Sequence, residues 1–259
     1  MKKIGIAITL MLVTLCGCVK ETQIIGKNSV KQEDAVDRIA ASKNRVQLGM
    51  GYLSQGQMPT AKYNFDKAIE LNPSSVEAHL ALAFYYQKVD DNVSAEKTYD
   101  RLLSLDSRNP DVLNNYGTFL CRNKKFDAAE KLFLKAVEQP DYIGIDDTYE
   151  NAGLCAAASG NAIKAEKYFK LAYGYNPQQL RLLIDLASLA LTNHHPAQAM
   201  QWANEYKQKL GADTADSLWI QLQAANQLGR VADLHVYGQA LVAQFPSSVQ
   251  AKKYQNNDY

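Results

Sequence analysis

Apolar and small side chains recur along this chain three and four residues apart, in blocks separated by short polar turns. This spacing is typical of amphipathic helices. The blocks come in pairs, and the pairs repeat with a period of 34 residues, which predicts a stack of helical hairpins. Six units can be aligned in this register: 42–75, 76–109, 110–143, 146–179, 180–213 and 215–248.

The residues at fixed places in each unit define the repeat more closely. The unit 42–75 has small residues at Gly49 and Ala61, an aromatic residue at Phe65 and a proline at Pro73. Small residues let two helices approach, the aromatic ring fills the remaining space, and proline ends the second helix. This is the tetratricopeptide signature. We therefore predict an all-α fold, a tetratricopeptide repeat solenoid of six helix-turn-helix repeats in a right-handed superhelix, over residues 39–248, with 249–259 as a C-terminal tail.

The N-terminus has a different pattern. Lys2 and Lys3 precede an apolar run that ends in Leu-Cys-Gly-Cys, so residues 1–17 are expected to be a lipoprotein signal peptide. The cysteine after Leu-x-Gly resembles the lipobox, and we predict that Cys18 is lipidated. An ordinary signal peptide with an incidental cysteine is the alternative. Residues 18–38 are expected to be the lipidated N-terminus and a flexible tether.

The residue after Cys18 bears on the location of the protein. It is Val19 rather than Asp, which in similar lipoproteins permits transfer from the inner membrane. We therefore expect a lipid-anchored protein on the periplasmic face of the outer membrane.

Charge and candidate chemistry restrict the possible functions. Without residues 1–17 the chain has 28 − 2 = 26 Lys and Arg against 27 Asp and Glu, a formal charge of −1. A near-neutral chain argues against nucleic acid as a partner. His79, His194, His195 and His235 show no metal-ligand spacing, and neither a phosphate-binding loop nor a nucleophilic triad can be identified. We expect no enzyme activity, no metal, and no cofactor beyond the lipid on Cys18.

The first helix of each unit is expected to line the concave face of the solenoid. In the first two units the positions that face the groove predict an apolar floor with a charged rim, and in unit three a more polar strip. Such a surface suits a peptide segment of a partner. The alternative is that some of these residues complete the core or are covered by the N-terminal segment. The candidate partner-binding residues are Val46, Met50, Leu53, Leu80, Phe84, Lys88 and Asn114.

Two cysteines remain after removal of the signal peptide. Cys121 and Cys155 lie in the first helices of consecutive units, and an even number of cysteines in an oxidising compartment indicates a disulfide. The alternative is a pair of buried thiols that serve as small apolar residues. We predict the disulfide, which would stabilise the middle of the solenoid.

Two motifs around these cysteines narrow the family. Asn-Asn-Tyr-Gly-Thr-Phe-Leu-Cys ends at Cys121, and Tyr-Glu-Asn-Ala-Gly-Leu-Cys ends at Cys155. With the lipobox and six repeats, they make the whole chain resemble the type IV pilus biogenesis and stability lipoproteins PilF and PilW. The weak fifth and sixth units are the main departure from the pattern.

The resemblance implies a pilotin, which binds subunits of the pilus secretin and promotes their localisation and multimer assembly in the outer membrane. We expect the protein to be a monomer. One alternative is a periplasmic scaffold that stabilises pili without escorting the secretin. Another is a lipoprotein of outer-membrane barrel assembly, since those also contain tetratricopeptide units.

Overall fold

The computed structural model describes residues 27–259, with side chains from Ala35 onward, and this part of the chain consists of 13 helices joined by short turns. The helices are α1 (Lys27–Ser54), α2 (Met58–Leu71), α3 (Val76–Lys88), α4 (Asn92–Leu105), α5 (Pro110–Arg122), α6 (Phe126–Val137), α7 (Ile145–Ala158), α8 (Ala162–Tyr175), α9 (Arg181–Thr192), α10 (Pro196–Leu210), α11 (Ala215–Gln227), α12 (Val231–Gln244) and α13 (Val249–Gln255).

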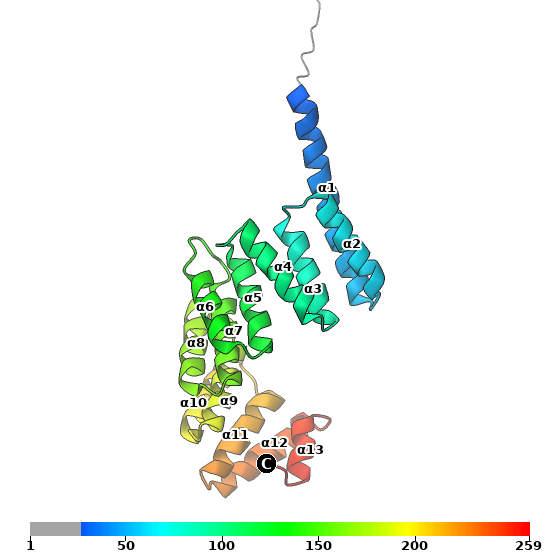
Figure 1. Ribbon diagram of the computed structural model, residues 1–259. Coiled ribbons are helices and arrows are strands. Elements are labelled where there is room, and N and C mark those ends of the chain that lie inside the picture. Colours follow the sequence, from blue (N-terminus) through cyan, green and yellow to red (C-terminus); the bar gives the residue numbers. More distant parts are fainter. Residues whose placement is uncertain (1–26) are drawn as a thin grey trace, which may run out of the picture.

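The first twelve helices form six pairs, one for each predicted unit, and the pairs stack into an arc (Figure 1). Helices α3, α5, α7 and α9 lie on the inner side of the arc, and α4, α6, α8 and α10 lie on its outer side (Figure 1). The prediction of an all-helical tetratricopeptide solenoid is confirmed.

A glycine and an aromatic ring join the two helices of three pairs. A Cβ atom on Gly49 would collide with the ring of Phe65, and one on Gly153 would lie 2.6 Å from the ring of Phe169. Gly117 and Phe133 repeat the arrangement. Only glycine leaves room for a ring packed directly on the backbone of the neighbouring helix. These contacts explain why the period of 34 residues carries small and aromatic residues at fixed places.

The turn within each pair has one residue in the left-handed region. Gly56, Gly160 and Gly229 fill this place in units one, four and six, with φ of 73°, 81° and 68°. Asp90, Lys124 and His194 take the same conformation in the other units, at φ of 57°, 60° and 58°. A residue with a Cβ atom adopts it at some cost. The turn is therefore set by the packing of the helices rather than by glycine alone.

The ends of the chain differ from the prediction. Residues 27–38, predicted to belong to a flexible tether, are the first part of α1, which projects past α2 (Figure 1). Their sequence contains neither Gly nor Pro, the residues that most disfavour a helix interior. Residues 249–255, predicted to be part of a tail, form α13, whose Tyr254 ring covers Gly238 of α12.

Candidate functional site

Three exposed apolar side chains stand at the same place of the repeat, on the first helices of units one, two and four. Met50 of α1 is 39% exposed, Phe84 of α3 is 36% exposed and Leu154 of α7 is 42% exposed. Each is the ninth residue of its unit, one residue after the small residue that faces the second helix. Because this place looks into the arc, the three side chains give the concave face an apolar surface in units one, two and four.

Two of the predicted groove residues are not on that surface. Val46 is 5% exposed and Leu53 is 7% exposed, and both belong to the hydrophobic core formed by α1, α2 and α3. They lie on the side of α1 that packs against its neighbours, so they complete the core. The prediction that they form the floor of the groove is wrong. For these two residues the alternative holds, that they complete the core.

The remaining predicted groove residues keep some exposure. Leu80 is half-buried against the core, and Lys88 is exposed with its Nζ 5.3 Å from the centre of the Phe84 ring. Asn114 is half-buried, and its Oδ1 accepts a hydrogen bond of 3.1 Å from Nδ2 of Asn151. The concave face is thus apolar and basic near Phe84 and becomes polar at Asn114.

Polar side chains connect the second unit to the third along the inner helices. Gln87 donates from Nε2 to the hydroxyl oxygen of Tyr99 at 2.9 Å, and Arg122 donates to Oε1 of Gln87 at 3.5 Å. Burial raises the pKa of Tyr99 to about 12, so its hydroxyl stays protonated at neutral pH. These bonds join α3 to α4 through Tyr99 and α3 to α5 through Arg122.

The two cysteines are joined across the inner helices. Cys121 of α5 and Cys155 of α7 form the disulfide that the sequence predicted, with 5.7 Å between their Cα atoms. Cys155 is buried and Cys121 is half-buried. The bond ties unit three to unit four directly below the polar part of the concave face.

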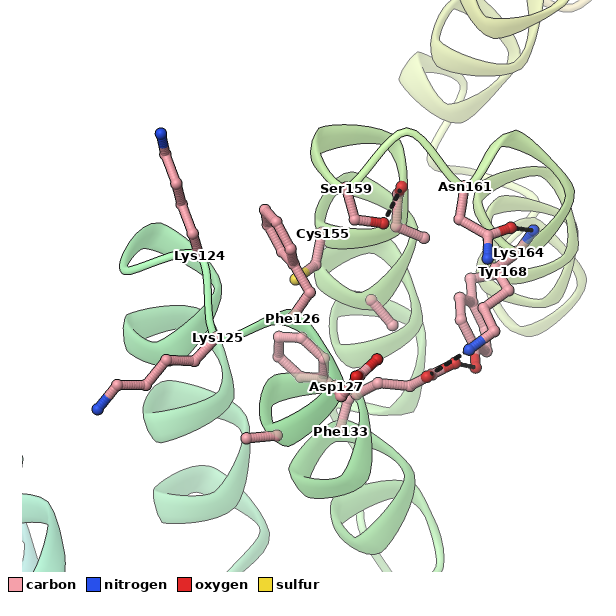
Figure 2. A pocket seen from close by; sticks show the side chains of 14 residues that line it. Lys124, Lys125, Phe126, Asp127, Phe133, Cys155, Ser159, Asn161, Lys164 and Tyr168 are labelled. Carbon is pink, nitrogen blue, oxygen red and sulfur yellow. Dashed lines mark hydrogen bonds and ion pairs between the residues drawn. The ribbon is translucent and has the colours of Figure 1, made fainter.

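A hollow with a volume of about 460 Å³ lies between α6, α7 and α8 (Figure 2). Figure 2 shows Phe126 turned toward Cys155 in its centre, while Lys124 and Lys125 point away from it. Lys164 donates to Glu130 at 2.6 Å, and the Tyr168 hydroxyl donates to the same carboxylate. Although burial raises it, these bonds hold the pKa of Glu130 below its usual value. The carboxylate of Glu130 is thus satisfied within the protein.

Other predicted features concern the lipid anchor and metal binding. Cys18 and the signal peptide 1–17 lie outside the described residues. Between residues 27 and 259 no helix is both long enough and apolar enough to cross a membrane. The described side chains also include no group of three or more His, Cys, Asp or Glu placed to hold a metal ion.

Sequence reasoning missed two residues of the concave face. Leu154 occupies the same place in unit four as Met50 and Phe84 in units one and two, so the repeat register could have identified it. Asn151 of α7 donates a hydrogen bond to Asn114 of α5. The two residues are 37 positions apart in the chain, and no local sequence pattern predicts that bond.

Helical pairs in this register and an exposed concave face define a tetratricopeptide repeat protein, a class that acts by binding other proteins. Sequence models agree. A model described as TPR repeat matches residues 49–90, and one described as Tetratricopeptide repeat matches residues 85–143.

Individual proteins extend the similarity to the whole chain. The type IV pilus assembly protein PilF of Pseudomonas aeruginosa is 31% identical over 246 residues, which cover 95% of each chain. A solved structure of Pseudomonas aeruginosa PilF matches 85% of this chain and 99% of its own, with a TM-score of 0.68 and 31% identity. The crystal structure of PilW, described as a widely conserved type IV pilus biogenesis factor, matches with a TM-score of 0.71 and 27% identity over 82% of this chain and 97% of its own.

The chain belongs to the PilF and PilW family of tetratricopeptide repeat proteins of type IV pilus biogenesis. The resemblance found in the two cysteine motifs is confirmed at this level.

Proposed function

We propose that this protein is a pilotin: a lipoprotein, anchored to the outer membrane through Cys18, that binds secretin subunits with its concave face and promotes their multimer assembly. The observation that carries the proposal is the exposure of Met50 and Phe84 on the inner helices. Covering these side chains with a partner removes apolar surface from water, which favours binding.

The surroundings of Phe84 support a peptide ligand. Lys88 lies over its ring, so a segment that inserts an apolar residue beside Phe84 also meets a positive charge that can pair with a carboxylate. Met50 and Phe84 are carried by α1 and α3, which share one hydrophobic core. A preformed surface of this kind loses little entropy on binding.

The test replaces the gene with variants and follows the secretin. Met50→Glu combined with Phe84→Glu should abolish heat-resistant secretin multimers and surface pili, because charged residues would have to be desolvated against the partner. Val93→Glu combined with Ile163→Glu is the matched control, since both residues are exposed and apolar but lie on the second helices α4 and α8. Circular dichroism must show that all variants fold.

The same strains test the anchor. Cys18→Ala should leave multimers absent or assembled in the wrong membrane, as shown by fractionation of unboiled membranes. Normal secretin multimers in the deletion strain, together with unstable pili, would contradict the pilotin and favour a scaffold. General loss of outer-membrane proteins would favour a role in barrel assembly.

A further inference from the structure

The loop between α6 and α7 carries a tyrosine that is held in one position. Tyr142 and Thr148 have their hydroxyl oxygens 3.0 Å apart, and Thr148 is fully buried. The Thr148 hydroxyl donates its single proton to the carbonyl of Gly144 at 2.8 Å, so Tyr142 is the donor in the bond between the two hydroxyls. A Cβ atom on Gly144 would lie 2.7 Å from the Tyr142 hydroxyl oxygen. Only glycine therefore allows this arrangement.

The fixed tyrosine lies beside the amide pair of the concave face. Burial raises the pKa of Tyr142, and side-chain hydrogen bonding by Thr148 and Asn114 acts in the opposite direction. Asn151 of α7 donates to Asn114 of α5 at 3.1 Å. The two side-chain amides are thus oriented by each other and by the loop.

This orientation leaves hydrogen-bonding groups available at the groove. Each asparagine has two N–H groups and one oxygen. The bond between them uses one N–H group of Asn151 and one lone pair of Asn114. The contact with the Tyr142 hydroxyl engages one N–H group of Asn114, which leaves one N–H group on each asparagine. Both side chains are half-buried, so the remaining groups are partly withdrawn from water. A ligand that offers both a carbonyl oxygen and an N–H group would satisfy them.

We propose that Asn114 and Asn151 form a main-chain recognition site for an extended peptide segment of the partner. An extended segment presents free N–H and C=O groups, whereas a helix uses nearly all of its own. Leu154, one helical turn after Asn151, supplies apolar surface for a neighbouring side chain. Asp111 and Asp147 are exposed and lie one helical turn before Asn114 and Asn151 on α5 and α7, so a Lys or Arg in the segment is favoured.

This inference rests on the proposed function, because it takes the segment to come from the secretin. It adds the chemistry that selects the segment. Apolar side chains bind near Met50 and Phe84, and the main chain binds in the middle of the groove. Recognition of the main chain tolerates many sequences, while the basic residue gives orientation.

The test measures binding of the purified periplasmic domains of the secretin to the full chain in detergent, by isothermal titration calorimetry. Asn114→Ala and Asn151→Ala should each weaken binding about tenfold, the usual effect of losing a hydrogen bond to a buried polar group. Asn115→Ala is the matched control. This asparagine is adjacent and exposed, and its amide donates to the Asp111 carbonyl within α5.

A second measurement examines the main chain directly. Synthetic 15-residue peptides tiled over the same secretin domains identify a binding segment, and N-methylation of its backbone amides should weaken binding to the unsubstituted chain at one position. The same methylated peptide should bind Asn151→Ala no more weakly than the unmethylated one does. If methylation no longer weakens binding to this variant, the peptide amide contacts the Asn114 and Asn151 side chains.

The outcomes are separable. If both asparagine variants bind within twofold of the unsubstituted chain while Met50→Glu with Phe84→Glu does not bind, the main-chain site is refuted and the pilotin stands. The main-chain site is also refuted if the asparagine variants lower only the midpoint of thermal unfolding, since the amides then merely tie α5 to α7. If the secretin domains do not bind the unsubstituted chain, both proposals fail.

Discussion

Both the middle of the solenoid and its C-terminal end contain a glycine packed against an aromatic ring. The two regions differ in which helices of the repeat supply the glycine and the ring. In the middle, the Gly153 backbone receives Phe169, a ring sixteen residues later in the same pair, α7 and α8. At the end, Gly238 of α12 receives Tyr254, also sixteen residues later, but this ring belongs to α13. Helix α12 therefore acts both as the second helix of unit six and as the first helix of a shortened further pair.

The two regions also differ in how neighbouring pairs are joined. One cluster of buried side chains runs from Ala83 in α3 to Leu186 in α9, and the disulfide crosses it. Helices α9–α13 contain two smaller clusters, and no disulfide occurs in this part of the described chain. The polar part of the concave face lies over the crosslinked region.

The comparison shows that the packing of two helices within a hairpin and the packing of one hairpin against the next depend on different contacts. A glycine and an aromatic ring can close a pair anywhere in the chain, including at an end, where they cover the last pair. Joining consecutive pairs requires further contacts, and between units three and four these include the disulfide. In solenoids, where each repeat contacts only its neighbours, such differences stay local.

Among the changes that test this difference between the middle and the end of the solenoid, removal of the disulfide should have the largest effect. The bond closes a loop of 34 residues, for which chain entropy gives about 4 kcal/mol of stabilisation. Cys121→Ala with Cys155→Ala should lower the free energy of unfolding of α5–α8 by that order. Urea unfolding followed by hydrogen exchange would measure it region by region.

The control for this variant is chemical reduction. Dithiothreitol should shift the unfolding of the unsubstituted chain and leave that of the double variant unchanged. Equal unfolding of the unsubstituted chain with and without reductant would mean that the crosslink does not distinguish the middle from the end.

A methyl group at Gly153 should have the next largest effect. Gly153→Ala places a Cβ atom 2.6 Å from the Phe169 ring, and overpacking of this kind costs about 2 kcal/mol. Gly174→Ala is the matched control, because a Cβ atom there meets nothing within 4 Å and gains about 1 kcal/mol of helix propensity. Because both substitutions gain this propensity, the two variants should differ by the overpacking cost, about 2 kcal/mol in free energy of unfolding. Phe169→Leu should partly rescue Gly153→Ala, and a failure to do so would locate the strain elsewhere.

The sequence predicts the repeated part of this fold because its core residues recur at a constant period. It misplaces both ends for a physical reason. The start of α1 is polar, and α13 is held by little more than Ala251 and Tyr254. Neither helix has the apolar stripe from which amphipathic helices are predicted. The period of 34 residues also ends before α13.

The concave face is predicted less completely than the fold. An apolar residue on an inner helix can point into the groove or pack against the next helix, and only the distances between helices decide. Val46 and Leu53 fall into the core for this reason, while Met50 remains exposed. The bond between Asn114 and Asn151 depends on how two repeats are placed, which no single repeat encodes.

The smallest expected effect concerns the C-terminal end. Tyr254→Ala should uncouple α13 from α12 at a cost of about 1 kcal/mol, because a helix of seven residues is not stable without packing. Hydrogen exchange should rise for the amides of α12 and α13. Val249→Ala is the matched control, since this exposed residue begins the same helix.

The decisive comparison in that experiment is with the amides of α5–α8. If the solenoid transmits stability only between neighbouring pairs, their exchange should not change when Tyr254 is replaced. Faster exchange in α5–α8 would show that the chain unfolds as one cooperative body. The glycine–aromatic contact at the end would then stabilise the binding face as well, and the distinction between closing a hairpin and joining hairpins would not hold.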